Sequence, residues 1–139
     1  MIRRCSLDQI VNQTIKNHAK TLISRQFSIQ RENLEHIVYT DVKWIDFILG
    51  QIVTNAVKYR NSEKPVLRFQ AEAFENQVIL TIEDNGCGIS ARDLPRIFDK
   101  GFTGDNGRQV AKSTGMGLYL VKQLCDKMNI GIQVQSQPG

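Results

Sequence analysis

The segment between residues 66 and 83 limits the possible folds more than any other part of this chain. Residues 66–74 and 78–83 alternate apolar and polar side chains in the manner of half-buried strands. Only Glu75, Asn76 and Gln77 lie between them, and so tight a link predicts an antiparallel hairpin. We therefore expect a sheet with at least one buried face.

Three segments with helical periodicity accompany this hairpin. The first spans residues 6–25, where Ser6 and Gln9 fit a capping box and an apolar stripe contains Leu7, Ile10, Val11, Thr14, Ile15, His18 and Leu22. The second runs from an N-cap at Asp41 to about residue 59, with a stripe of Trp44, Ile45, Phe47, Ile48, Ile52 and Ala56. The third spans residues 115–128, with Leu118, Val121, Cys125 and Met128 on one face.

The remaining segments complete an α/β two-layer sandwich. Short β-prone runs predict strands at residues 27–30 and 36–39, and a last strand begins at residues 131–135. We expect a short helix at residues 90–98 and a mobile loop at residues 99–114, where glycines and charges replace any periodicity. The sequence thus predicts about three long helices packed on four or five mostly antiparallel strands.

Length and composition exclude several classes of protein. A chain of 139 residues with 41% hydrophobic and 23% charged residues is long and apolar enough to fold as a single domain. It has neither an apolar run of membrane-spanning length nor the apolar region of a secretory signal. Three cysteines without metal-site spacing fit a reducing compartment, so we expect a soluble cytoplasmic domain or a fragment of one.

The net charge of +4 does not identify the class of ligand, because the basic residues are scattered along the chain. A weakly basic surface suits a phosphate-bearing ligand as well as a nucleic acid. Nucleic-acid binding ranks last among the functions considered, since the sequence has no basic stripe and no interleaved aromatic residues.

A pair of amides interrupts the apolar pattern of the second helix. Gln51 and Asn55 are spaced i,i+4 and share a face at the margin of the stripe, with Lys58 and Tyr59 one turn further on. Their oxygens are suitable ligands for a hard cation such as Mg²⁺. By spacing alone, an ordinary hydrogen bond to a neighbouring loop is the more common explanation.

Glycines follow polar groups at two further places. Asp84 ends the predicted strand, and its carboxylate could accept a hydrogen bond from an amine. Gly86 and Gly88 follow, and without Cβ atoms the backbone there could approach a flat ring. An ordinary turn is an equally good reading of that segment. Gly115 and Gly117 open the third helix, and the free N–H groups of a helix start can bind an anion. Neither a dinucleotide fingerprint nor a Walker A motif fits there, because Leu120, Asn106 and Ala111 stand where glycines are required.

Together, and in this order, the three features resemble the N, G1 and G2 boxes of the GHKL, or Bergerat-fold, family of ATP-binding domains. Residues 97–102, Ile-Phe-Asp-Lys-Gly-Phe, resemble the F box of sensor histidine kinases. The resemblance covers essentially the whole chain. Within the family, residues 101–108 and 113–120 are most similar to the antimicrobial-peptide-sensing kinases of Gram-positive bacteria.

The resemblance implies an α+β sandwich with a mixed, mostly antiparallel sheet, a mobile ATP lid at residues 99–114, and ATP and Mg²⁺ as cofactors. Asn55 would ligate Mg²⁺ with Gln51 beside it, Lys58 would approach the phosphates, Tyr59 would line the pocket, and Asp84 would accept from the adenine amine. Further nucleotide contacts are implied at Gly86, Gly88, Ile89, Phe98, Lys100, Arg108, Lys112, Thr114, Gly115, Met116, Gly117 and Leu118.

One departure from the hydrolytic members of the family bears on the reaction. Where those members have a glutamate that activates water, this chain has Gln51, whose amide is not a useful general base. The resemblance therefore implies phosphoryl transfer to a histidine of an adjoining helical dimerisation domain. Neither His18 nor His36 has the sequence context of such a phosphoacceptor.

The chain is accordingly expected to be the catalytic fragment of a longer, membrane-bound, homodimeric sensor kinase with a cognate response regulator. Relatives usually continue beyond residue 139 into another strand, so the last strand is expected to be truncated. Two alternatives stay open: a free-standing GHKL serine kinase of the anti-sigma-factor type, and a non-catalytic nucleotide-sensing module.

Overall fold

In the computed structural model, β4 (Val66–Ala73) and β5 (Val78–Asp84) form the antiparallel hairpin that the sequence predicts. Phe69 lies opposite Ile82 and Ala71 opposite Leu80, so their side chains share one face of the sheet. β2 (Ser28–Glu32) pairs with β4 in parallel and gives the strand order β2-β4-β5. The sheet is therefore mixed, as expected.

The structure describes residues 2–60, 63–75, 77–86 and 94–99, together with Leu120, Lys122, Gln123, Cys125 and Asp126. The chain divides into two units, Met1–Gly86 and Cys87–Gly139. The first unit contains all three helices that can be described along their length, both sheets and six of the predicted site residues.

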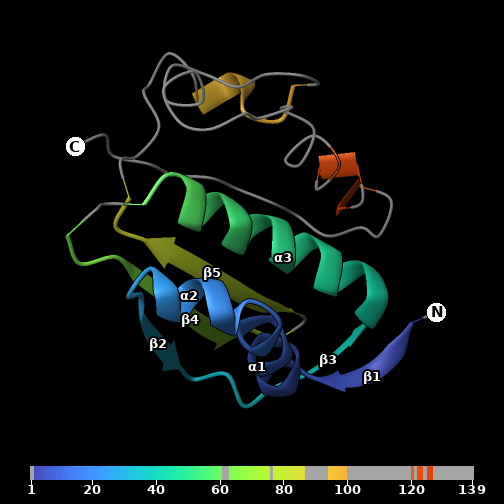
Figure 1. Ribbon diagram of the computed structural model, residues 1–139. Helices are drawn as coiled ribbons and strands as arrows, with labels where there is room; N and C mark the ends of the chain where they lie inside the picture. Colours follow the sequence, from blue (N-terminus) through green and yellow to red (C-terminus); the bar gives the residue numbers. More distant parts are fainter. Residues whose placement is uncertain are drawn as a thin grey trace. The chain divides into compact units, whose positions relative to one another are not determined.

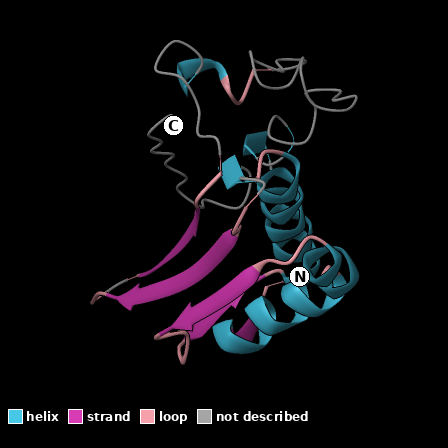
Figure 2. Cartoon of the chain, turned by 60° about the vertical axis from the view of Figure 1, so that its left-hand side comes forward, coloured by secondary structure: helices cyan, strands magenta, loops and turns pink. Residues whose placement is uncertain are grey.

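The helices of the first unit lie on one side of the three-stranded sheet (Figures 1 and 2). They are α1 (Leu7–Asn17), α2 (Ala19–Ser24) and α3 (Val42–Lys58). Their apolar side chains meet those of β4 in a single core, which consists of Leu7, Val11, Leu22, Leu34, Val53, Ala56, Leu67, Phe69 and Ala71. This arrangement is the predicted two-layer sandwich.

The prediction of one continuous helix over residues 6–25 is wrong, because the helix breaks at His18. Asn17 and His18 are weak helix formers, and the His18 N–H is shared between the Thr14 and Ile15 carbonyls at 3.2 Å each. The change in direction still allows Leu22 of α2 to reach the core. The predicted cap is present: the Ser6 hydroxyl accepts from the Gln9 N–H at 3.2 Å.

β1 (Arg3–Ser6) has no counterpart in the sequence prediction. It forms a separate two-stranded antiparallel sheet with β3 (Ile37–Thr40), which lies one residue later than predicted. Four residues with two arginines show no apolar alternation, so the strand depends on its pairing partner rather than on its own pattern.

α3 begins after Asp41, as predicted, and the Asp41 carboxylate accepts from the Lys43 and Trp44 N–H groups. The predicted stripe is confirmed at Ile48 and Ala56, but it misses Leu49 and Val53 and wrongly includes Trp44. The buried residues are Ile48, Leu49, Val53 and Ala56, whereas Trp44 is 41% exposed. The helix carries apolar residues on more than one side, and Val53 and Ala56 are the two that join the core cluster with β4.

The second unit is described in part. The predicted helix over residues 90–98 appears as a short 3₁₀-helix, η1 (Leu94–Arg96), within the described residues. All five described residues between 120 and 126 are helical, in agreement with the third predicted helix, and Cys125 is buried. The loop at residues 100–114 and the strand from residue 131 lie outside the described residues.

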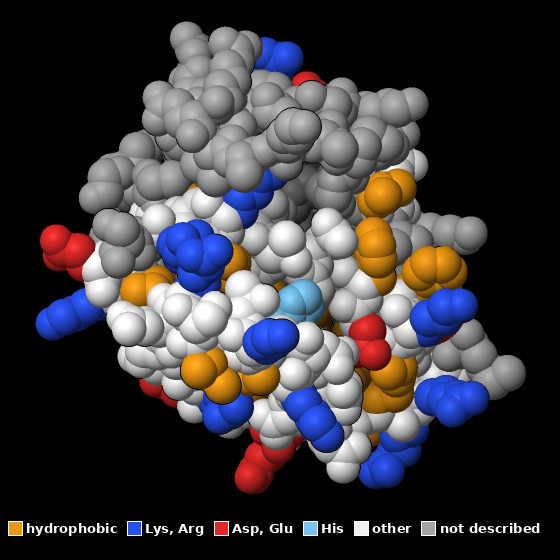
Figure 3. All heavy atoms as spheres, in the orientation of Figure 1, with side chains coloured by type: hydrophobic (Ala, Val, Ile, Leu, Met, Phe, Trp, Pro, Cys, Tyr) orange, Lys and Arg blue, Asp and Glu red, His pale blue; other side chains and the backbone are white. Residues whose placement is uncertain are grey.

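The described side chains form no basic stripe on the face shown in Figure 3. In Figure 3 the lysine and arginine side chains are spread over the coloured part of the displayed face. Within the described residues, no helix has both the length and the apolar character that crossing a membrane requires.

Candidate functional site

α3 presents its amides on the side opposite the core. At 100° per residue, Gln51 and Asn55 lie roughly 160° and 200° around the helix axis from Val53. Both side chains are half-buried, and in the described part of the chain neither amide makes a side-chain hydrogen bond. The structure thus keeps two amide oxygens together on one face of the helix, and oxygen ligands of this kind suit Mg²⁺.

The same face continues to the C-terminal end of α3. Lys58 follows Asn55 by one turn, and its ammonium lies 5.6 Å from the centroid of the Tyr59 ring. Burial lowers the pKa of Lys58 below its usual range. No carboxylate pairs with Lys58 among the described residues, so the cation is available to an anionic ligand.

The turn after β5 is organised by its own side chains. The Asp84 Oδ1 accepts from the Gly86 N–H at 2.8 Å, which closes an Asx turn. Oδ1 is therefore engaged within the turn. Oδ2 has no partner within the residues that the structure describes, and it is the oxygen left for an external donor.

Gly86 brings this turn against the end of α3. A Cβ added to Gly86 would lie 2.5 Å from the Tyr59 carbonyl oxygen and 2.8 Å from the Asp84 Oδ1, closer than real atoms approach. Only glycine fits between these groups. The contact places the Asp84 turn directly beside Tyr59, so two of the three predicted motifs meet in space.

Asn85 is a residue whose role the sequence reasoning missed. Its Oδ1 accepts from the Val66 N–H at 2.7 Å, and its Nδ2 donates to the Lys64 carbonyl at 2.8 Å. These two bonds tie the turn to the segment that leads into β4. An Asn between Asp and Gly is typical of a turn, but a bond spanning 19 residues leaves no local signal.

The third predicted motif lies outside the described residues, as do most of the other predicted nucleotide contacts. The predicted contact residues outside the description are Gly88, Ile89, Lys100, Arg108, Lys112, Thr114, Gly115, Met116, Gly117 and Leu118. Phe98 is described and half-buried within the second unit, beside the buried Ile97. Their predicted roles stay predictions.

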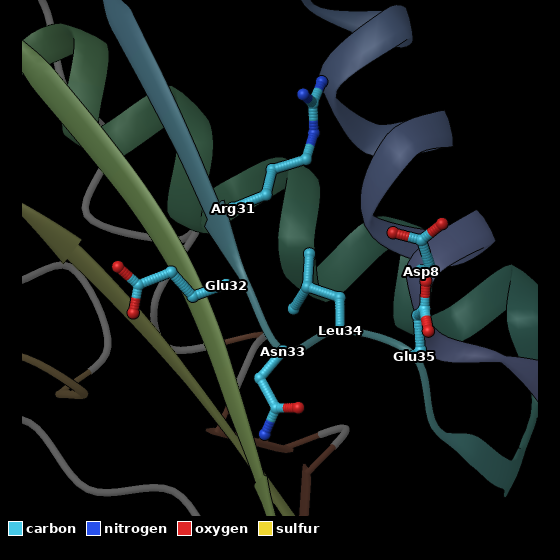
Figure 4. A pocket seen from close by; sticks show the side chains of 6 residues that line it. All are labelled: Asp8, Arg31, Glu32, Asn33, Leu34 and Glu35. Carbon is cyan, nitrogen blue, oxygen red and sulfur yellow. The ribbon is translucent and has the colours of Figure 1, made fainter.

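A hollow of about 240 Å³ elsewhere in the first unit does not have the character of a ligand site. It is lined by Asp8, Arg31, Glu32, Asn33, Leu34 and Glu35, whose polar ends point in different directions (Figure 4). The Glu32 carboxylate already accepts from Arg68 at 2.7 Å, and the Asn33 amide donates to the Ala71 carbonyl at 2.9 Å. Among the described residues, no group of three His, Cys, Asp or Glu side chains could hold a metal ion.

Residues 40–139 match the family of histidine kinase-, DNA gyrase B-, and HSP90-like ATPases. The chain is 37% identical over 139 residues to the sensor histidine kinase YxdK of Bacillus subtilis, covering 99% of this chain and 43% of that protein. It is 39% identical over 138 residues to the sensor protein kinase GraS of Staphylococcus aureus, covering 99% and 38%. For the sensor protein BceS of Halalkalibacterium halodurans the identity is 36% over 140 residues, covering 99% and 41%. The chain thus spans about two fifths of the length of these relatives.

Solved structures of histidine kinases share the fold. The catalytic domain of histidine kinase ThkA superposes with a TM-score of 0.78 at 19% identity, covering 91% of this chain and 82% of that one. The mycobacterial sensor histidine kinase MprB gives a TM-score of 0.75 at 16% identity, covering 93% and 81%. With the family match and the sensor-kinase relatives, this likeness assigns the chain to the histidine kinase-, DNA gyrase B-, and HSP90-like ATPases, as a catalytic domain of the sensor histidine kinase type with the Bergerat fold.

Proposed function

We propose that this domain binds ATP with Mg²⁺ and transfers the γ-phosphoryl group to a histidine carried by another part of the full-length kinase. The observation that carries the proposal is the meeting of the Asp84 turn with Tyr59 at the end of α3, seen in the closeness of Gly86 to the Tyr59 carbonyl. That contact brings the Asp84 carboxylate, which can bind a nucleobase, next to the face of α3 that can bind phosphates and a cation.

Asp84 would select adenine. Its Oδ2 can accept a hydrogen bond from the exocyclic amine, while Oδ1 stays bonded to the Gly86 N–H. Guanine presents a carbonyl at that position, so GTP would place two acceptors against each other. A hydrogen bond to a charged acceptor contributes about 1.5–3 kcal/mol, so discrimination of tenfold or more is expected.

Asn55 would hold Mg²⁺, with Gln51 as a second or water-mediated ligand. The bound cation would neutralise phosphate charge as it develops during transfer. Lys58 would contact a phosphate oxygen from the same helix face, and its partial desolvation strengthens that attraction. Gln51 leaves this position without a general base for water, which favours transfer over hydrolysis.

The phosphoacceptor would come from outside this domain. The His18 imidazole lies against Gly50, where an added Cβ would be 3.4 Å from Nε2, and His36 precedes β3. Neither belongs to the candidate site. We propose that the acceptor histidine lies in a helical dimerisation domain of a membrane-bound homodimer, and that a response regulator receives the phosphoryl group next.

Titration of this chain with ATP, ADP and GTP, with and without Mg²⁺, tests the binding step. We expect ATP to bind more tightly than GTP by about tenfold, and Mg²⁺ to increase the affinity for ATP. Asp84→Asn should remove the preference for ATP, whereas Asp8→Asn, a carboxylate on α1, should leave it intact. A folded protein that binds ATP and GTP equally well would refute the site.

Incubation of the full-length kinase with γ-labelled ATP tests the transfer step. Acid-labile, base-stable label on the kinase itself is the expected result, and Asn55→Ala should abolish it. Label that is stable in acid and located on a serine of a partner protein would indicate a serine kinase instead. Nucleotide binding with no label on the full-length kinase would indicate a nucleotide-sensing module.

A further inference from the structure

Exposed apolar side chains gather where β1, β3 and the first turn of α3 come together. Ile2 is 73% exposed and Tyr39 is 71% exposed, and both belong to or adjoin the two-stranded sheet. The aromatic-basic face, as we call this surface, consists of Ile2, Arg4, Ile37, Tyr39, Val42, Lys43 and Trp44, and every one of these residues is exposed. Exposed side chains of this size require an explanation when they cluster.

The register of the small sheet places part of this set on a single surface. Arg4 lies opposite Tyr39, and Ser6 opposite Ile37. Residues directly opposite each other in an antiparallel pair share a face, and Ile2 follows on the same side because side chains alternate. Cys5 and Val38 form the other face and are less exposed. The outer face of the sheet therefore alternates apolar side chains with a cation.

The first turn of α3 follows β3 closely along the chain. β3 ends at Thr40 and α3 begins at Val42, so only Asp41 lies between strand and helix. The Lys43 ammonium lies 5.6 Å from the centroid of the Trp44 ring. In Figure 3, orange and blue side chains lie near one another on the side of the N-terminus, with a red side chain among them. Aromatic and basic groups thus lie side by side here.

The charge of the aromatic-basic face is positive. Arg4 and Lys43 are its charged side chains, and the nearest acid along the chain, Asp41, accepts the first N–H groups of α3. A second copy of this face would be repelled by like charge, so self-association through it is disfavoured. The complementary partner must be anionic and must accept apolar side chains at the same time.

We propose that the aromatic-basic face binds an anionic lipid surface. Tryptophan and tyrosine favour the interface between water and lipid, where their rings are apolar and their N–H and O–H groups reach water. Lysine and arginine beside them are attracted to acidic headgroups. Two isoleucines and a valine supply apolar area that can enter the same layer. This property goes beyond the proposed nucleotide function and does not depend on it.

The chain contains a single tryptophan, Trp44, which makes the test direct. Its emission reports on the aromatic-basic face and on no other part of the protein. We expect a blue shift when the chain meets vesicles of phosphatidylcholine with about 30% phosphatidylglycerol, and no shift with pure phosphatidylcholine vesicles. High salt should reverse the shift, and the chain should sediment with the acidic vesicles.

Variants separate this face from the rest of the surface. Tyr39→Ser and Arg4→Gln should each lower partitioning by about fivefold without changing the melting temperature. Ile23→Ser and Lys20→Gln, exposed on α2, should partition like the parent chain. An unchanged emission spectrum at every lipid concentration would overturn the proposal and leave an acidic protein as the partner. Equal partitioning of Arg4→Gln and Lys20→Gln would overturn it too.

Discussion

The substitution Asn85→Ala is expected to weaken both the stability of the domain and its affinity for ATP. Asn85 makes two side-chain bonds to backbone groups, at 2.7 Å to the Val66 N–H and at 2.8 Å to the Lys64 carbonyl. A hydrogen bond of this kind contributes about 1 kcal/mol net. Loss of both should lower the free energy of unfolding by about 2 kcal/mol and the melting temperature by about 4–8 °C.

The effect on ATP has a separate cause. Asn85 anchors the turn in which Asp84 Oδ1 accepts from the Gly86 N–H, and a turn released from its anchor must be ordered again when adenine binds. An ordering cost of about 1 kcal/mol corresponds to a roughly fivefold weaker affinity for ATP. Calorimetric titration measures this quantity for the folded protein, at a temperature well below the melting transition of either protein.

Asn33 provides the matched control. Its amide donates to the Ala71 carbonyl at 2.9 Å, far along the chain from the Asp84 turn, and its φ of 55° suits glycine. Asn33→Gly should therefore lower stability by about 1 kcal/mol and leave ATP affinity unchanged. The reasoning is refuted if Asn33→Gly weakens ATP binding as much as Asn85→Ala does, or if Asn85→Ala matches the parent chain in both measurements.

Four further changes have defined outcomes. Gly86→Ala places a Cβ 2.5 Å from the Tyr59 carbonyl oxygen, so thermal denaturation should show a loss of about 1–3 kcal/mol, together with weaker ATP binding in titration. Asn55→Ala should abolish the gain in ATP affinity on adding Mg²⁺; an equal loss with and without Mg²⁺ would mean that the helix itself was damaged. Burial raises the pKa of Asp46, so its charge opposes folding at neutral pH. The free energy of unfolding should therefore rise as the pH falls toward about 4. In urea denaturation, Asp46→Asn should be more stable than the parent chain at pH 7 and equal to it in acid. Gln26→Gly relieves a φ of 61° at the end of α2 and should stabilise by about 0.5–1 kcal/mol, measured in the same way.

The elements that the sequence predicts well are those with strong local signals. The β4–β5 hairpin follows from alternation and a short link, and the start of α3 from an aspartate before an apolar helix. β1 and the break at His18 have no such signal. β1 depends on pairing with β3, more than 30 residues away. Asn17 and His18 are weak helix formers, but such residues do not by themselves predict a break where the apolar stripe continues to Leu22.

The site shows the same division between local and long-range information. The motif residues on α3 and after β5 can be recognised from residue type and spacing. Their meeting at Gly86 and Tyr59 is a tertiary contact, and so are the bonds that make Asn85 an anchor. Ligand-binding residues are therefore easier to predict from the sequence than residues such as Asn85 that hold them in place.

α3 buries apolar residues on more than one side, and this explains why the helix can serve the core and the site together. Val53 and Ala56 belong to the core cluster, whereas Ile48 and Leu49 are buried outside it. At 100° per residue, Ile48 lies on the side of Gln51 and Asn55. A helix with one apolar stripe would expose its amides to water, where they would bind a cation weakly. Burial of Ile48 beside them shows that this second side is also shielded. The amides and Lys58 are thus held in a partly desolvated place, where attraction to phosphates and a metal ion is stronger than at an open surface.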